Sequence, residues 1–260
     1  MKNCYFQHDS KESEVFTCFD GENLVCSRCC TEACPVETPD WFLDCSQAGH
    51  PTWPAIASNS SVPHKLVCLE SYWTNQLFIE KTVKPFLDGL NPLLRNSLAI
   101  AHRHIESMAG LKFYTQYPEG LLWKDPLSWD TPLFYLAFHG RPGTIGTVLD
   151  AVGPNLLCEA FEGYGGYKTI IYFGACSVFK GQKGRKFADD FLQSSKVNAI
   201  VGYTEDVDWM DSMIIDMLFI QRFYNDPDPW ANLKDIFYSI VEDYKPAKKF
   251  GYIMFHRDAD

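Results

Sequence analysis

The chain has 260 residues, of which 46% are apolar and 22% are charged, so it can bury a sizeable core and is not predicted to be disordered. Its formal net charge of −10 opposes binding to a phosphate backbone, and we expect no nucleic-acid partner. No apolar run is long enough for a membrane span, and the N-terminus lacks the apolar stretch of a signal peptide. We therefore expect a cytoplasmic protein with no membrane partner.

The N-terminal part of the chain differs in composition from the rest. Seven of the ten cysteines lie in the first 45 residues, and the first 62 residues carry three Lys/Arg against nine Asp/Glu. A stretch rich in Pro, Ser and Asn follows, which is typical of a linker. We predict a small Cys-rich domain at 1–50, a linker at 51–63 and a larger domain at 64–260.

Strands and helices alternate in the larger domain. In chain order we predict a strand at 64–70, helices at 76–93 and 93–108, strands at 111–116 and 132–138, a helix at 145–161, a strand at 168–174, a helix at 185–194, a strand at 197–203, helices at 211–224 and 229–243, and a strand at 251–256. Several strands are continuous apolar runs, which indicates a sheet covered on both faces. The fold class is therefore α/β, a three-layer sandwich with a mostly parallel sheet.

Two strand ends carry reactive side chains. The strand YLAF is followed by His139 and Gly140, and the strand IIYFGA is followed by Cys176, 37 residues after the histidine. Consecutive parallel strands are usually neighbours, so both side chains should project from one edge of the sheet. An imidazole beside a thiol forms a nucleophile–base pair, and Gly140 lets a carbonyl oxygen approach its amide.

The other cysteines and histidines of this domain have simpler interpretations. Cys68 falls inside a strand and Cys158 inside a helix, and both are predicted to be core residues. His102 and His104 lie two apart on a predicted helix, cannot face one site together and are predicted to be on the surface. The alternative for the His139 and Cys176 pair is that both are packing residues.

The motifs YLAFHG, YFGACS and VNAIVGYTEDVDWMDS, in this order of elements, resemble the caspase-like cysteine peptidases, and most of all their CHAT branch. The resemblance covers roughly residues 64–225. It implies a caspase-like sheet and a peptidase with His139 as the base and Cys176 as the nucleophile. It also implies oxyanion donors at the amides of Gly140 and Cys176, and no metal in the reaction.

Acidic residues follow the strand next to the one that bears the cysteine. Glu205, Asp206 and Asp208 would rim the same crevice and could hold a Lys or Arg side chain at P1, with Trp209 as a wall. Many caspase-like families other than the true caspases prefer basic P1 residues, which agrees with this prediction. The alternative is a solvated acidic loop followed by a helix cap at Asp211.

The run TCFDGENLVCSRC resembles the centre of a B-box-type zinc finger, in which eight ligands bind two zinc ions. By that resemblance one site would use Cys4, His8, Cys26 and Cys29, and a second would use Cys18 with Asp20, Cys34, Cys45 or His50. Structural zinc suits a segment that is too small for a core, and disulfides or unliganded cysteines are the alternatives. Such a finger would serve as a protein-recognition module.

The sequence thus predicts a cysteine endopeptidase that acts on protein or peptide substrates through a thioester on Cys176, with regulation through the finger. A binding protein, in which the finger recognises a partner and the caspase-like domain is an inactive scaffold, is the main alternative. A cysteine hydrolase or acyltransferase that is not a peptidase is a third.

Overall fold

A computed structural model of the chain describes residues 64–74, 81–94, 98–125, 131–162, 168–195 and 197–257, together with two short strands nearer the N-terminus. Contacts divide the chain into two units, Met1–Val62 and Pro63–Asp260. In the first unit, β1 (Val15–Thr17) pairs antiparallel with β2 (Leu24–Cys26). The predicted linker and, apart from the backbone of Cys26, all the predicted zinc ligands lie outside the described residues. The zinc module therefore stays a prediction.

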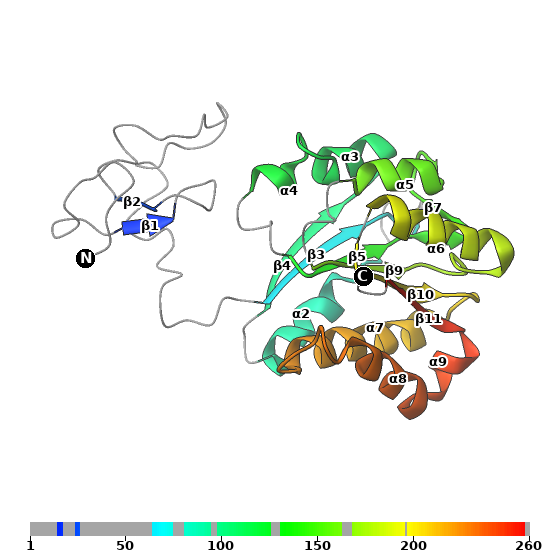
Figure 1. The fold of residues 1–260 in the computed structure, drawn as a ribbon. Helices are drawn as coiled ribbons and strands as arrows, with labels where there is room; N and C mark the ends of the chain where they lie inside the picture. The colour runs from blue at the N-terminus through cyan, green and yellow to red at the C-terminus, as the bar shows by residue number, and fades with distance from the viewer. Residues whose placement is uncertain are drawn as a thin grey trace. The chain divides into compact units, whose positions relative to one another are not determined.

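The second unit is built on a six-stranded sheet (Figure 1). From edge to edge its strands are β11 (Tyr252–His256), β10 (Ala199–Tyr203), β9 (Ile170–Gly174), β5 (Leu133–Ala137), β3 (His64–Glu70) and β4 (Leu98–His104). Neighbouring strands are parallel except for β10 and β11. Every residue of β5 and β10 is buried, which explains why these strands read as unbroken apolar runs.

Helices cover both faces of this sheet (Figure 1). One face carries α3 (Met108–Thr115), α4 (Leu121–Lys124), α5 (Pro154–Ala160) and α6 (Gly181–Ser195), and the other carries α2 (Lys84–Leu93), α7 (Trp209–Asn225), α8 (Leu233–Asp243) and α9 (Lys245–Lys249). Successive strand residues point to opposite faces, so Leu133 and Tyr135 enter one apolar core while Phe134 and Leu136 enter the other. The predicted α/β class with a mostly parallel, helix-covered sheet is confirmed.

A small antiparallel sheet follows β5 directly. It consists of β6 (His139–Arg141), β7 (Thr144–Gly146) and β8 (Ala151–Val152). The predicted helix at 145–161 is therefore wrong in its first half. The helix begins only at Pro154, a residue that favours the first helical turn because it has no amide hydrogen to leave unpaired.

Two neighbouring elements were predicted with the wrong type. The run LAIAHRH, expected within a helix at 93–108, forms β4, where pairing with β3 over its whole length outweighs the helix preference of its alanines. The expected strand at 111–116 is α3. Ser107 caps that helix by accepting a hydrogen bond from the amide of Gly110 at 3.1 Å, and Gly110 lies in its first turn.

The remaining predicted elements have the predicted type in the structure, and the differences lie mainly at their ends. Helix α7 begins at Trp209, and its cap is Asp208 in place of the predicted Asp211. The helix predicted at 76–93 begins at Lys84, after residues that lie partly outside the described part of the chain. Part of the unassigned stretch 117–130 forms the short helix α4.

Candidate active site

His139 and Cys176 lie at the carboxyl ends of two adjacent parallel strands. Strands β5 and β9 are paired so that Ala137 faces Gly174, and each reactive side chain follows its strand by two residues. Both residues line one pocket with a volume of about 230 Å³. The pairing of the strands thus brings the imidazole and the thiol to a single cavity.

Gly140 lies directly against the backbone of Cys176. A Cβ atom at residue 140 would lie 2.9 Å from the backbone nitrogen and the carbonyl carbon of Cys176, and it would overlap the carbonyl oxygen. Only a residue without a side chain permits this approach of the two backbones. The start of β6 is therefore placed against the turn that carries the thiol.

The turn after Cys176 is held by the loop that follows β10. Ser177 has a left-handed backbone, with φ at 53°, and its amide donates to the carbonyl of Glu205 at 3.0 Å. The hydroxyl of Ser177 donates to the carboxylate of Asp206. The Cys176 thiol itself is free and half-buried, and it makes a long contact of 4.0 Å with the carbonyl oxygen of Val207. These contacts fix the turn and leave the sulfur without a strong hydrogen bond.

Two tryptophans form the aromatic wall of the pocket. The ring of Trp73 meets the imidazole of His139 edge to face, with centroids 5.0 Å apart, and meets Trp209 in the same manner at 4.9 Å. Trp73 follows β3 and Trp209 opens α7, so residues far apart in the sequence build this wall. Trp209 was among the predicted substrate-binding residues, whereas Trp73 was not.

The three predicted substrate carboxylates have other partners. Glu205 forms an ion pair with Lys180 at 2.5 Å, and Asp206 accepts the Ser177 hydroxyl. The carboxylate of Asp208 caps α7 by accepting from the amides of Met210 and Asp211, at 3.0 and 3.2 Å. Among the lining residues of the pocket, none of these three carboxylates occurs. The structure therefore favours the alternative of a solvated acidic loop with a helix cap.

A different carboxylate lines the pocket. Asp216 lies on α7, is 1% exposed and accepts hydrogen bonds from the hydroxyls of Tyr135 at 2.6 Å, Tyr172 at 2.5 Å and Tyr203. Burial raises the pKa of Asp216 to about 6, although the three hydroxyl groups oppose that rise. Gly174 leaves room for Tyr135, since a Cβ atom there would lie 2.6 Å from the tyrosine hydroxyl.

Sequence reasoning missed Asp216 because a lone acidic residue in a helix is usually exposed. The only signal was its position within the otherwise apolar run MIIDMLF, which would place a charge on a buried face. The three tyrosines that satisfy it come from β5, β9 and β10, and no spacing along the chain reveals such a network.

A second sequence prediction fails near the same wall. His102 and His104 were placed on a helix surface, but they lie on β4, where residues two apart share a face. Their rings are 4.9 Å apart, and both approach the buried carboxylate of Glu70. Among the described residues, these three form the group of side chains that could hold a metal ion.

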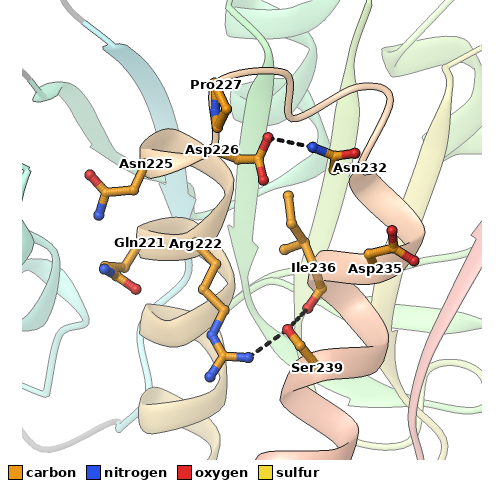
Figure 2. Close-up of a pocket in the computed structure, with 9 residues that line it drawn as sticks. All are labelled: Gln221, Arg222, Asn225, Asp226, Pro227, Asn232, Asp235, Ile236 and Ser239. Carbon is orange, nitrogen blue, oxygen red and sulfur yellow. Dashed lines mark hydrogen bonds between the residues drawn. The ribbon is translucent and has the colours of Figure 1, made fainter.

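A larger hollow of about 570 Å³ lies between α7 and α8, and Figure 2 shows its lining. Two hydrogen bonds join four of its polar side chains: Arg222 donates to Ser239 at 2.5 Å, and Asn232 donates to Asp226 at 3.0 Å. No cysteine or histidine is among its lining residues. The smaller pocket, which holds both reactive groups, is therefore the candidate active site.

Cys68 and Cys158 differ from Cys176 in their surroundings. Cys68 is fully buried in β3, and burial, followed by the charge of Glu70, raises the pKa of its thiol. Burial also raises the pKa of the Cys158 thiol on α5. Neither lines the candidate active site.

No protein-family model matches the chain, and a search of curated proteins finds no match either. Within the part of the chain that the structure describes, no helix is both long enough and apolar enough to cross a membrane. The geometry of the pocket is therefore the feature that indicates a function.

Proposed function

We propose that the chain is a cysteine endopeptidase of the caspase-like type, CHAT branch, with His139 and Cys176 as its catalytic pair. The observation that supports this most is their presence in one pocket at adjacent strand ends, with Gly140 against the backbone of the cysteine. Carboxyl ends of parallel strands are the usual position of active sites in open α/β sheets.

The proposed reaction is acyl transfer. His139 takes the proton of the Cys176 thiol, and the thiolate attacks the scissile carbonyl carbon. The amides of Gly140 and Cys176 stabilise the negative oxygen of the tetrahedral intermediate. The imidazolium then protonates the leaving amine, a thioester remains on the sulfur, and water activated by His139 hydrolyses it. No metal ion takes part in these steps.

We propose that the pocket accepts a Lys or Arg side chain at P1. Trp73 and Trp209 supply aromatic rings, which attract cations. This recognition differs from the predicted one, because it keeps Trp209 and relies on the aromatic rings in place of the loop carboxylates. Substrates would be proteins or peptides, and the cytoplasm is the compartment in which we expect the protein to act.

The Cys-rich segment at 1–50 is proposed as a structural zinc module that binds a protein partner and regulates the peptidase. The spacing of its cysteines is typical of zinc ligands, and the segment is too small for a core of its own.

Labelling with a peptide electrophile that carries Lys at P1 tests the catalytic assignment. We expect the full-length protein to be modified at Cys176, as mapped by peptide mass spectrometry. Cys176→Ala should abolish labelling, and His139→Ala should slow it by about 100-fold or more, since general-base catalysis contributes roughly that much. Cys158→Ala, which removes another half-buried thiol, is the matched control and should label as the wild type does.

Circular dichroism shows whether each variant keeps its fold. A folded wild type that takes no label at Cys176, or a Cys176→Ala variant that still cleaves peptides, contradicts the assignment. The first outcome would support the alternative of an inactive scaffold that acts through its finger.

A further inference from the structure

Glu70, His102 and His104 gather at the carboxyl end of the β3–β4 pair. The two strands are parallel, with Glu70 paired to His104 and Cys68 paired to His102, so these side chains share one face of the sheet. One ligand atom from each of the three residues lies within 4.8 Å of the others. Strand pairing thus assembles two imidazoles and a carboxylate that are up to 34 residues apart in the sequence.

The donor set fits a divalent transition metal. Two histidines and one glutamate are the protein ligands of open tetrahedral zinc sites, in which water takes the fourth position. Calcium and magnesium are less suited, because they prefer oxygen ligands. Nε2 of His102 lies 2.6 Å from Oε2 of Glu70 in a hydrogen bond. Metal bonds of about 2.0–2.1 Å in tetrahedral geometry require these atoms to separate by less than about 1 Å.

The carboxylate of Glu70 is already oriented by a second layer of donors. Its oxygens accept from Nε1 of Trp73 at 2.6 Å, from the hydroxyl of Thr82 at 2.6 Å and from the amide of Val83 at 2.8 Å. Burial alone would raise the pKa of Glu70. The hydrogen bonds from His102 and these three groups outweigh the effect of burial, so the pKa of Glu70 lies below its ordinary value. Such outer contacts commonly fix the ligands of metal sites.

His104 supplies an independent indication that the site is incomplete. Its Nδ1 atom is buried and has no hydrogen-bond partner among the described residues. A buried polar atom without a partner costs roughly 1–3 kcal/mol, so such atoms are rare unless something else binds them. The ring of Tyr72 stacks on His104 with centroids 5.0 Å apart, and Tyr72 is 44% exposed. The cluster is thus covered on this side by a surface side chain, which a metal ion from solvent could pass.

We propose that Glu70, His102 and His104 bind one divalent transition-metal ion of the zinc class, with water as the fourth ligand. Binding replaces the hydrogen bond between Nε2 of His102 and Oε2 of Glu70 with bonds from these two atoms to the metal. This site is separate from the proposed zinc module at 1–50, and it has no step in the proposed peptidase reaction.

Zinc stoichiometry of the full-length protein tests the proposal. The protein is stripped with a chelator, dialysed against excess Zn²⁺ and then against buffer, and its zinc is measured by elemental analysis. A variant with His102→Ala and His104→Ala should hold one zinc per chain less than the wild type. His64→Ala, a histidine on β3 outside the cluster, should hold the wild-type amount. Zinc bound by the N-terminal cysteines is common to all three proteins and cancels in the difference.

A Co²⁺ titration of the wild type adds a measurement that needs no variant. Co²⁺ on two histidines and a glutamate absorbs in the visible range without the near-ultraviolet charge-transfer band that thiolate ligands produce. We expect the visible absorbance to increase during the addition of one equivalent of Co²⁺ without a matching increase of the thiolate band. Equal zinc content in the wild type and the double variant, or visible absorbance that follows the thiolate band throughout, overturns the proposal.

Discussion

Gly140 is the residue at which the candidate active site tolerates least change. Its Cα hydrogen faces the backbone of Cys176, and any Cβ atom would overlap the carbonyl oxygen of that residue. The sequence suggested Gly140 for another reason, access of a substrate oxygen to its amide. The structure adds a packing reason, because the glycine sets the spacing between the histidine-bearing and cysteine-bearing segments.

Gly140→Ala should therefore disrupt the site. We expect the rate of Cys176 labelling by the peptide electrophile to fall by roughly 100-fold or more, as when an oxyanion donor is displaced. Gly153→Ala is the matched control, since a Cβ atom at residue 153 meets no atom within 4 Å. Labelling kinetics of both variants provide the measurement, and a Gly140→Ala protein that labels at the wild-type rate would show that the two backbones are not in contact.

The single residues of the site were predictable to different degrees. His139 and Cys176 follow apolar strands, and the rule that parallel strand ends share an edge was enough to pair them. Asp216 and Trp73 were not predictable, because their roles arise from contacts with β3, β5, β9 and β10 that only the folded sheet creates.

At the scale of elements, local preference and long-range pairing gave opposite answers for β4. Its alanines favour a helix, yet it forms an edge strand whose seven residues all pair with β3. Because β4 is predicted as a helix, His102 and His104 are predicted on a helix surface, and the sequence gives no sign that they meet Glu70 on one face of the sheet. The buried strands β5, β9 and β10 were predicted well, because their apolar runs are too short and too uniform for surface helices.

Helix α7 allows the role of Asp208 to be tested. Its carboxylate accepts two amide hydrogen bonds at the start of the helix, so Asp208→Ala should lower the free energy of unfolding by about 1 kcal/mol. Asp208→Asn keeps a side-chain oxygen that can accept these hydrogen bonds, so its free energy of unfolding should fall by much less. Urea denaturation measures both variants. Preference for Lys at P1 should be unchanged, and a loss of that preference at wild-type stability would restore Asp208 to the substrate-binding residues.

At the scale of the whole molecule, one sheet separates two apolar cores, and a charged group lies inside one of them. The carboxylate of Asp216 reaches β5, β9 and β10 through the three tyrosines and thereby ties α7 to the middle of the sheet. Burial of an ionisable group makes the stability of the whole fold depend on pH.

The direction of that dependence follows from the pKa of Asp216, which rises from 3.8 to about 6 on folding. The contribution of the bound proton is fully present below pH 3.8 and is lost as the pH rises through about 6. The free energy of unfolding of the wild type relative to Asp216→Asn should therefore fall by an amount on the order of 3 kcal/mol between pH 4 and pH 7.

Urea denaturation at several pH values measures this difference. Asp88→Asn is the surface control, since the Asp88 side chain is 52% exposed. The free energy of unfolding of this variant should change with pH in the same way as that of the wild type. A constant difference between the wild type and Asp216→Asn across this range would mean that Asp216 does not titrate as its burial requires.

The edge-to-face contact between Trp73 and His139 also has an optical consequence. An imidazole in contact with an indole ring can quench its emission, and the two rings are 5.0 Å apart. The fluorescence of Trp73, isolated by subtraction of a Trp73→Phe spectrum, should therefore increase in a His139→Ala variant. Light emission would then report whether the proposed base stays beside its aromatic neighbour.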